Sequence, residues 1–215
     1  MIDLEILFED ENIIAVNKPK DIASISENDL NKETIHSILE RKQKKKIFIV
    51  HRLDKEVSGV ILFAKNSRTH KYLNQQFSDR AIKKSYVALV HGIMKNDEGV
   101  INKSIREFGS GSMGIDDKKG KASVTAYKVL ERFDNYTLVE LNPTTGRRHQ
   151  LRVHLYSIGH PIAGDIRYGE KEIQKGYPRL MLHAKSISFV NSFDKKIFVS
   201  AELPESFKTM LGNLM

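Results

Sequence analysis

Asp54 stands in a short polar segment between two runs of apolar residues. Residues 51–59 carry several charged or titratable side chains, whereas residues 47–50 and 60–64 are continuous apolar runs, typical of strands covered on both faces. An aspartate between such strands would be held on rigid elements inside a cleft, which is the arrangement that a catalytic carboxylate needs. The alternative is a purely structural ion pair between Arg52 and Asp54.

A second cluster of titratable side chains follows Gly146. The pattern of residues 146–155 predicts a helix with a buried leucine stripe. The opposite face would carry Arg148, His149 and Arg152, because Arg152 lies four residues after Arg148 and three after His149. A buried cation that faces a carboxylate keeps the acid ionised at neutral pH, as a nucleophile or a general base requires. The alternative is an ordinary basic helix face in solvent.

The sequence argues against several other kinds of catalytic site. It contains no cysteine, so disulfides, thiolate catalysis and cysteine-based zinc sites are excluded. His149 and His154 would lie roughly 140° apart on a helix, so they do not form a metal-binding face. Residues 109–114 match a dinucleotide-binding glycine loop, but no helical stripe follows them. Neither a serine-hydrolase elbow nor a Walker loop is present. We therefore predict no metal and no cofactor.

The charge balance favours a polyanionic partner. The net charge is +8 and the pI is near 9.5, and neutralising phosphates with lysine and arginine releases condensed counterions. Nucleic acid is the leading candidate, with an anionic membrane second. The sharpest basic run, residues 41–46, ends a predicted helix and either lies in solvent or contacts phosphate.

The sequence carries no sign of a membrane span or of export. No apolar run approaches the roughly 18 residues that a span needs. The acidic start lacks the basic-then-apolar order of a secretory signal. We therefore expect a soluble, cytoplasmic protein.

The order of apolar patterns predicts an α+β fold with a mostly antiparallel sheet. Helices are expected over residues 33–42, behind Thr34, and after a cap at Asn66 or Ser67. Residues 95–121 predict a hairpin with a long mobile tip. No repeat or linker divides the chain, so we expect a single domain over residues 1–215. The expected strands are residues 12–16, 47–50, 60–64, 83–91, 122–130, 136–141, 180–190 and 196–201.

Several blocks of the chain resemble the motifs of RluA-type RNA pseudouridine synthases. The central block is His51-Arg52-Leu53-Asp54, followed by Ser58-Gly59 and an apolar run that ends at residues 64–65. Further blocks follow in the family's order at residues 16–19, 84–88, 145–155, 160–165 and 182–184. The resemblance spans roughly residues 4–204, which is essentially the whole chain.

The resemblance implies a mixed, largely antiparallel sheet with flanking helices and a central catalytic cleft. It also implies that Asp54 is the catalytic aspartate, that Arg152 is its basic partner and that Tyr86 stacks on the bound base. Arg52 resembles the residue that enters the space left by the base, which must be extruded to expose its glycosidic bond. The substrate-binding residues expected here are Arg52, His51, Arg148 and His149.

The implied reaction converts uridine to pseudouridine without a cofactor. The glycosidic bond breaks, and the uracil rotates and rejoins through carbon; whether Asp54 attacks the sugar or abstracts a ribose proton stays open. Val57 and Arg148 depart from the family pattern, and Arg148 would add charge near the cleft. A non-catalytic RNA-binding protein on the same fold and a nucleoside N-glycosidase are the alternatives.

The resemblance also bears on partners. We expect a stem-loop of ribosomal or transfer RNA as the substrate, no membrane contact and no obligate protein partner. The protein is expected to act as a monomer without a separate N-terminal RNA-binding module.

Overall fold

The computed structural model describes residues 2–26, 33–109 and 111–214. Ser110, which belongs to the predicted glycine-rich segment, therefore lies outside the described residues. The chain divides into two compact units. Unit 1 comprises Met1–Lys84 and Ala184–Glu202, and unit 2 comprises Ser85–His183 and Leu203–Met215. Each unit is described by itself below.

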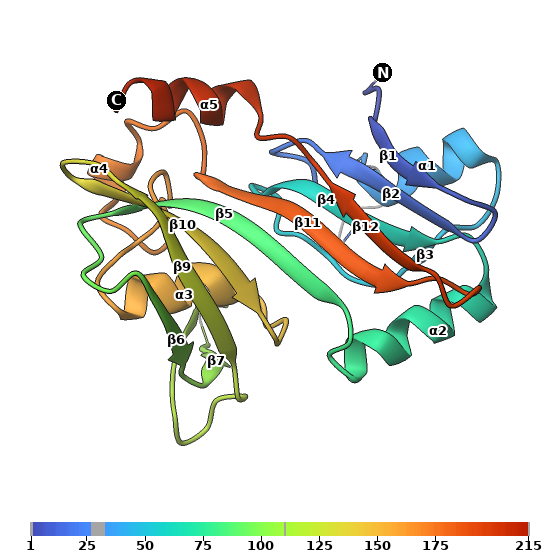
Figure 1. The fold of residues 1–215 in the computed structure, drawn as a ribbon, viewed down its shortest axis with the longest axis horizontal. Helices are drawn as coiled ribbons and strands as arrows, with labels where there is room; N and C mark the ends of the chain where they lie inside the picture. Colours follow the sequence, from blue (N-terminus) through green and yellow to red (C-terminus); the bar gives the residue numbers. More distant parts are fainter. Residues whose placement is uncertain (1, 27–32, 110, 215) are drawn as a thin grey trace. The chain divides into compact units, whose positions relative to one another are not determined.

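Unit 1 is built on strands that lie in the order β1, β2, β4, β11 (Figure 1). Strand β12 pairs with β11, and the short strand β3 pairs with β4. All seven residues of β4 are buried, because this continuous apolar run is covered on both faces. The strands are β1 (Ile6–Glu9), β2 (Ile13–Lys18), β3 (Phe48–Ile49), β4 (Ser58–Ala64), β11 (Leu182–Val190) and β12 (Lys196–Ser200).

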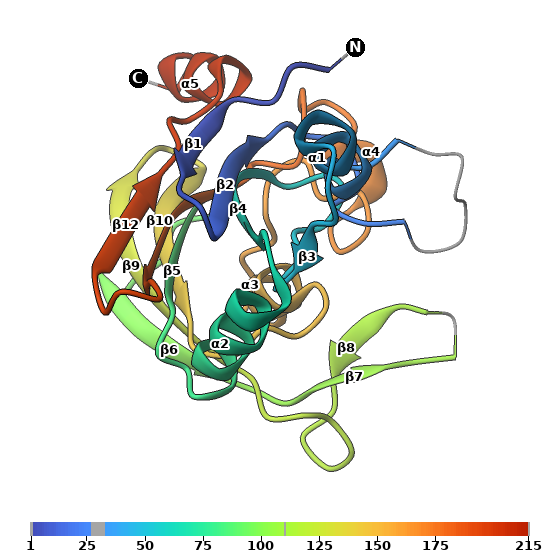
Figure 2. The same ribbon diagram turned by 90° about the vertical axis from the view of Figure 1, so that its right-hand side faces the viewer.

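Two helices complete unit 1, and both begin at the predicted caps. Helix α1 (Ile35–Gln43) starts behind Thr34, whose hydroxyl accepts a hydrogen bond from the Ser37 backbone within a capping box. Helix α2 (Ser67–Ser78) starts behind Asn66, whose side chain accepts from the Thr69 amide. Figure 2 shows both helices beside the strands of this unit.

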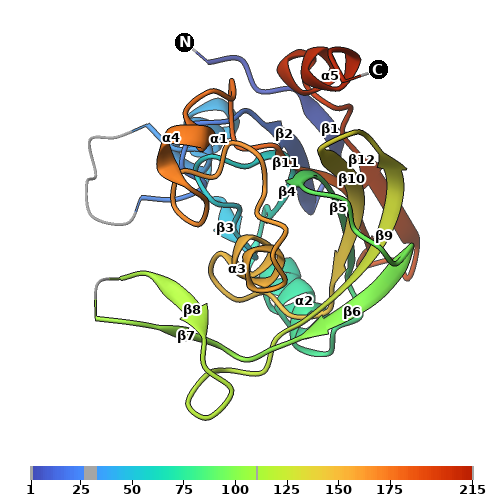
Figure 3. The same cartoon turned by 90° about the vertical axis from the view of Figure 1, so that its left-hand side faces the viewer.

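Unit 2 contains a second run of strands, in the order β5, β10, β9, β6 (Figure 3). A separate hairpin, β7–β8, and helices α3, α4 and α5 complete it. The strands are β5 (Lys83–His91), β6 (Glu98–Asn102), β7 (Ile105–Glu107), β8 (Met113–Ile115), β9 (Val124–Arg132) and β10 (Tyr136–Pro143). The helices are α3 (Gln150–Ser157), α4 (Lys171–Gln174) and α5 (Glu205–Gly212).

Helix α3 is fixed to β9 by two of its polar side chains. The Gln150 amide donates to the Val124 carbonyl and to the Thr125 hydroxyl, both at 3.0 Å. The His154 ring joins the Thr125 hydroxyl at 2.9 Å and the Lys103 carbonyl at 3.0 Å. Because these groups are paired, polar residues can occupy a helix that is buried nearly all round.

The predicted α+β class with a mostly antiparallel sheet is confirmed. Antiparallel pairing joins β1 to β2, β2 to β4, β3 to β4, β5 to β10, β10 to β9, β9 to β6, β7 to β8 and β11 to β12. Strand β5 covers the residues that were predicted for it. Among the described residues, no helix combines the length and the apolar character that crossing a membrane requires.

Three details of the prediction were wrong. Residues 47–50 do not form a strand covered on both faces, since β3 has only two residues and both are partly exposed. Residues 95–121 do not form one hairpin, because β6 pairs with β9, whereas β7 pairs with β8. Helix α3 begins at Gln150, so residues 146–149 precede it instead of forming its first turn.

Candidate active site

The predicted catalytic aspartate lies in the connection between β3 and β4. These strands pair antiparallel, with Phe48 opposite Ala64, so residues 50–57 form the loop that joins them. Asp54 is partly buried there, and its carbonyl accepts a hydrogen bond from the Val57 amide at 3.1 Å. Arg52 is exposed on the same loop.

The backbone on both sides of Asp54 is anchored by residues distant in sequence. On one side, the Ser24 hydroxyl donates to the Leu53 carbonyl at 2.7 Å and accepts from the Leu53 amide at 3.1 Å. On the other side, the Lys18 ammonium donates to the Lys55 carbonyl at 2.9 Å. Asp54 therefore stands on a loop whose neighbouring peptide groups are fixed.

Lys18 is fully buried, although it carries a charge. Besides Lys55, its Nζ donates to the carbonyls of Pro19 at 2.9 Å and Ile22 at 2.7 Å. An ammonium has three N–H donors, so three carbonyl oxygens offset much of the cost of removing it from water. The side chain thus ties residues 18–22 to the Asp54 loop.

His51, a predicted substrate-binding residue, is engaged within the protein. Its Nε2 accepts a hydrogen bond from the Leu62 amide at 3.0 Å, and its ring lies 5.1 Å from that of Phe77. Burial, and secondarily the Lys84 charge, lowers the pKa of His51 to about 3. Burial also lowers the pKa of Lys84 to about 8. His51 is therefore neutral at pH 7, and its contact with RNA stays a prediction.

Tyr86 lies in β5 of unit 2, where its backbone is opposite Leu141 of β10. Its side chain is partly buried. The preceding residue, Ser85, donates to the Glu140 carboxylate at 2.6 Å. A tyrosine on a paired strand has little backbone freedom, which suits an aromatic surface for stacking.

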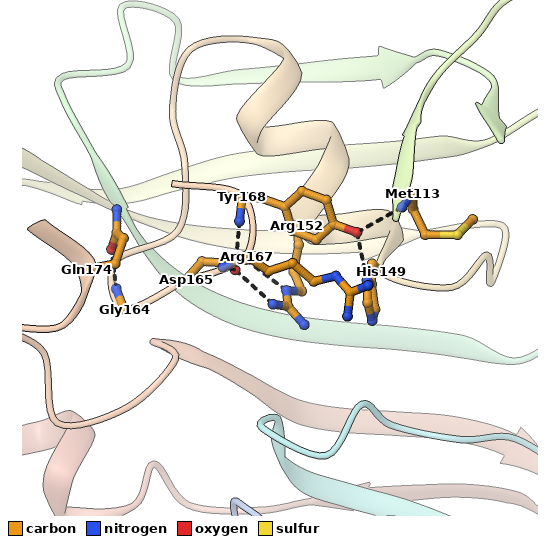
Figure 4. A network of polar contacts seen from close by, with 8 residues as sticks. All are labelled: Met113, His149, Arg152, Gly164, Asp165, Arg167, Tyr168 and Gln174. Atoms are coloured by element: carbon orange, nitrogen blue, oxygen red, sulfur yellow. Dashed lines mark hydrogen bonds and ion pairs between the residues drawn. The ribbon is translucent and has the colours of Figure 1, made fainter. Parts of the chain in front are cut away.

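Arg152 is buried in helix α3 and forms a two-point ion pair with Asp165. Its Nε donates to Oδ2 at 2.8 Å and its Nη2 donates to Oδ1 at 2.7 Å (Figure 4). The side chains are 4% and 0% exposed, respectively. Asp165 belongs to one of the blocks that resemble the family, but nothing in its spacing from Arg152 predicted this pair.

His149 and Tyr168 extend this cluster (Figure 4). His149 directly precedes helix α3 in the left-handed region, with φ 54°. Its Nδ1 lies 2.7 Å from the Tyr168 hydroxyl, which also accepts from the Met113 amide at 3.3 Å. Burial raises the pKa of Tyr168, so its hydroxyl stays protonated near neutrality.

The shared cationic helix face predicted for Arg148, His149 and Arg152 was wrong. Arg148 and His149 precede the helix, so they cannot share one of its faces with Arg152. Gln150 to Leu155 are all buried, which also contradicts the alternative of a basic helix face in solvent. Arg148 instead makes an exposed ion pair with Glu107 of β7 at 2.8 Å. The structure thus brings together His149 and Arg152, through Tyr168, and places Arg148 at the β7–β8 hairpin.

Each unit holds side chains that suit acid–base or nucleophilic chemistry. Unit 1 offers the Asp54 carboxylate on an anchored loop, and unit 2 offers an ordered guanidinium and a tyrosine on a strand. The pairing of Asp54 with Arg152 remains a prediction, as does the alternative pair with Arg52.

Comparisons with known proteins identify the class. Residues 12–157 match the family model described as RNA pseudouridylate synthase. The chain is 36% identical to "Ribosomal large subunit pseudouridine synthase C" of Buchnera aphidicola subsp. Baizongia pistaciae. The alignment covers 98% of this chain and 70% of that protein. The chain is 37% identical to the protein of the same name from Haemophilus influenzae, covering 98% of this chain and 68% of that protein.

Solved structures agree with this class. The structure named "Human RNA Pseudouridylate Synthase Domain Containing 4" is 26% identical, with a TM-score of 0.82 over 98% of this chain and 92% of that one. "Human RNA Pseudouridylate Synthase Domain Containing 1" is 28% identical, with a TM-score of 0.77 over 99% and 94%. The matches define an RNA-modifying isomerase. The chain belongs to the RNA pseudouridylate synthase family, and the predicted conversion of uridine to pseudouridine is confirmed as its activity.

Proposed function

We propose that this enzyme modifies uridine in large-subunit ribosomal RNA. The support is the name shared by the relatives, which are about one third identical over nearly the whole chain. The net charge of +8 suits an RNA substrate, since phosphate contacts supply much of the affinity of such complexes. Transfer RNA, the other substrate expected from the sequence, has no such support from those names.

Asp54 is the essential carboxylate in this proposal. The observation that carries its role is the anchoring of its loop, by Ser24 on one side and Lys18 on the other. A catalytic group needs this positioning, because a displacement of about 1 Å can cost roughly a hundredfold in rate. Arg152 keeps the carboxylate ionised, as an opposite charge nearby does.

The remaining site residues act on the nucleotide. Tyr86 stacks on the extruded uracil, and Arg52 occupies the space that the base leaves. His51, His149 and Arg148 complete the RNA contacts. Extrusion is needed because the stacked base hides its glycosidic bond, and unstacking costs a few kcal/mol.

The reaction is an isomerisation that balances without any co-reactant. The bond between N1 of uracil and C1′ of ribose breaks, the ring rotates, and a bond forms between C5 and C1′. The proton leaves C5 and N1 gains one. An ionised Asp54 serves either course, by attacking C1′ or by removing a ribose proton.

The test is to map pseudouridine in ribosomal and transfer RNA from cells with and without this gene. The proposal predicts at least one site in large-subunit ribosomal RNA that disappears with the gene and is restored by the purified enzyme on a transcript. Loss of sites only in transfer RNA would contradict the target. Release of free uracil in place of pseudouridine would indicate an N-glycosidase.

We also propose that the enzyme works as a monomer in the cytoplasm. A single copy supplies Asp54, Tyr86 and Arg152, so the proposed chemistry needs no second chain. Analytical ultracentrifugation at micromolar concentration tests this, and a stable dimer would contradict it.

A further inference from the structure

Asp165 is a buried carboxylate with a dense set of hydrogen bonds. Besides the two bonds from Arg152, its Oδ1 accepts from the Arg167 amide at 3.0 Å and from the Tyr168 amide at 3.2 Å (Figure 4). Charge-assisted bonds of this kind are stronger than neutral ones. The carboxylate is therefore held by its own backbone and is not simply carried along by Arg152.

The turn that presents Asp165 is itself constrained. Gly164, just before it, has φ +78°, and a Cβ there would lie 1.9 Å from the Arg179 carbonyl oxygen. The Gly164 amide donates to Oε1 of Gln174 at 2.6 Å (Figure 4). The Asp165 amide donates to the Ile162 carbonyl at 3.1 Å. The position of the carboxylate is thus set by the fold of residues 162–179.

The ring of Tyr168 restricts the movement of the Arg152 guanidinium. The centre of the guanidinium lies 5.2 Å from the centroid of the Tyr168 ring, within the range of a cation–π contact. The Tyr168 hydroxyl is held by His149 and Met113. Asp165 therefore fixes the plane of the guanidinium and Tyr168 restricts its tilt.

Stability alone is a poor explanation for this arrangement. Burying two charges costs several kcal/mol per ion, and replacing a buried ion pair by apolar residues is often neutral or stabilising. What an apolar pair would not supply is a guanidinium in one orientation. The Arg152 guanidinium has five N–H donors, and Asp165 accepts hydrogen bonds from two of them. The planar geometry of the guanidinium directs the other three away from Asp165.

We infer that Asp165 is a positioning residue, which holds the Arg152 guanidinium in the one orientation that its role in the reaction requires. This inference rests on the proposed function, in which Arg152 is the partner of Asp54. Asp165 touches neither substrate nor reacting atoms and acts only through Arg152. Its loss should therefore slow the reaction without weakening RNA binding.

The test compares Asp165→Asn with the wild-type enzyme on a transcript in which the wild type forms pseudouridine. We expect kcat to fall roughly 10- to 100-fold, as when a supporting hydrogen bond to a functional group is lost, while KM stays within about threefold. Asp134→Asn, an exposed carboxylate in unit 2, is the matched control and should keep wild-type values. Unchanged kcat in Asp165→Asn would overturn the inference.

A double variant separates positioning from general destabilisation. If Asp165 acts only through Arg152, its substitution should have no further effect once Arg152 is lost, because the effects of substitutions at coupled residues do not add. R152M D165N should then turn over no more slowly than R152M. The double variant leaves neither charge of the pair alone, whereas R152M leaves Asp165 without its partner, so circular dichroism checks the folding of each variant before the rates are compared. A further loss of about fivefold or more in the double variant would refute the positioning role.

A spectroscopic readout keeps this inference distinct from the proposed function. The ¹⁵N-labelled protein should show a slowly exchanging arginine Nε–H signal that is absent from Arg152→Lys. Exchange of that signal should speed up at least tenfold in Asp165→Asn and stay unchanged in Asp134→Asn. If the wild type makes no pseudouridine, the proposed function fails, but the exchange signal still tests the role of Asp165. Unchanged exchange in Asp165→Asn would show that Asp165 does not position Arg152.

Discussion

The guanidinium of Arg152 and the carboxylate of Asp165 form a two-point ion pair, at 2.7 and 2.8 Å, that is almost fully shielded from water. The pair links helix α3 to the turn after Ile162. Arg152 is thus held as an oriented donor in unit 2.

Lys18 should matter for catalysis although it is fully buried and remote in sequence from the loop it holds. Lys18→Met leaves three carbonyls without their donor, and we expect it to lower the free energy of unfolding by about 2–4 kcal/mol. Turnover should fall at least tenfold with little change in RNA affinity, since the Asp54 loop loses an anchor. Urea unfolding and single-turnover kinetics measure the two effects.

Lys20→Met is the control for Lys18→Met, because the Lys20 side chain is 40% exposed and pairs with Asp21. It should be nearly neutral. Ser24→Ala is a milder variant that removes the other anchor of the loop. Wild-type turnover in both Lys18→Met and Ser24→Ala would show that the anchors do not position Asp54.

His51 should make the fold sensitive to acid. Its pKa is about 3 in the folded chain, against 6.5 ordinarily. Between these two pH values the unfolded chain binds more protons than the folded chain. The free energy of unfolding therefore rises with pH across this window, by at most about 1.4 kcal/mol per pH unit, and the same stability is lost when the pH falls. His51→Gln, whose side-chain oxygen can accept from the Leu62 amide, should show a flatter curve. Identical pH dependence in both proteins would contradict this.

Gly59 should tolerate no side chain. Its φ is +110°, and a Cβ would lie 2.1 Å from the Ala184 carbonyl oxygen. Gly59→Ala is therefore expected to destabilise the protein by about 3 kcal/mol or more, because both backbone strain and a backbone clash result. Gly212→Ala, where a Cβ meets nothing within 4 Å, should change stability by less than about 0.5 kcal/mol. Thermal or urea unfolding of the two variants checks the difference.

The basic end of helix α1 offers a test of RNA contact. Arg41 pairs with Glu33 and Lys42 with Asp3, whereas Lys44 and Lys45 are exposed beyond the helix. If both contact phosphate, replacing them with alanine should reduce the slope of log affinity against log salt by about 1.4–1.8.

Filter binding at several salt concentrations measures this slope. Replacing Lys195 and Lys196, two exposed lysines of unit 1, is the charge-matched control. A slope reduced equally by both pairs of substitutions would show only a general charge effect. An unchanged slope for Lys44 and Lys45 would favour a solvated helix end.

The local chemistry of the chain was predictable where short-range rules apply. The caps at Thr34 and Asn66 were foreseen because a hydroxyl or amide oxygen before an apolar stripe marks a helix start. Strand β5 was foreseen from its length and apolar content. Strand β1 and helix α5 were not, since β1 has only four residues, half of them exposed, and α5 buries only Phe207.

The start of helix α3 was misjudged for a physical reason. The Gln150 side chain accepts hydrogen bonds from the Thr145 hydroxyl at 2.7 Å and from the Arg147 amide at 3.0 Å. This stabilises a turn before the helix, with His149 in the left-handed region. Helical periodicity in residues 146–149 carried no sign of that competing turn.

The supporting contacts of the site could not be read from spacing. Lys18 reaches the Lys55 carbonyl across 37 residues, and Arg152 reaches Asp165 across 13. Neither separation follows a helix or strand period, so only the tertiary fold brings these groups together. The family resemblance predicts the reacting residues, and the structure adds the contacts of Lys18 and Asp165 near two of them.

The most direct test of the account is the turnover of Asp54→Asn, measured as pseudouridine formed in a transcript under single-turnover conditions. The substitution keeps size and shape but removes the negative charge, so RNA affinity should stay within a few fold of the wild type. The account predicts no detectable pseudouridine from this variant, and wild-type yield from Asp10→Asn, a unit 1 control outside the proposed site. Appreciable pseudouridine from Asp54→Asn would contradict the assignment of the essential carboxylate.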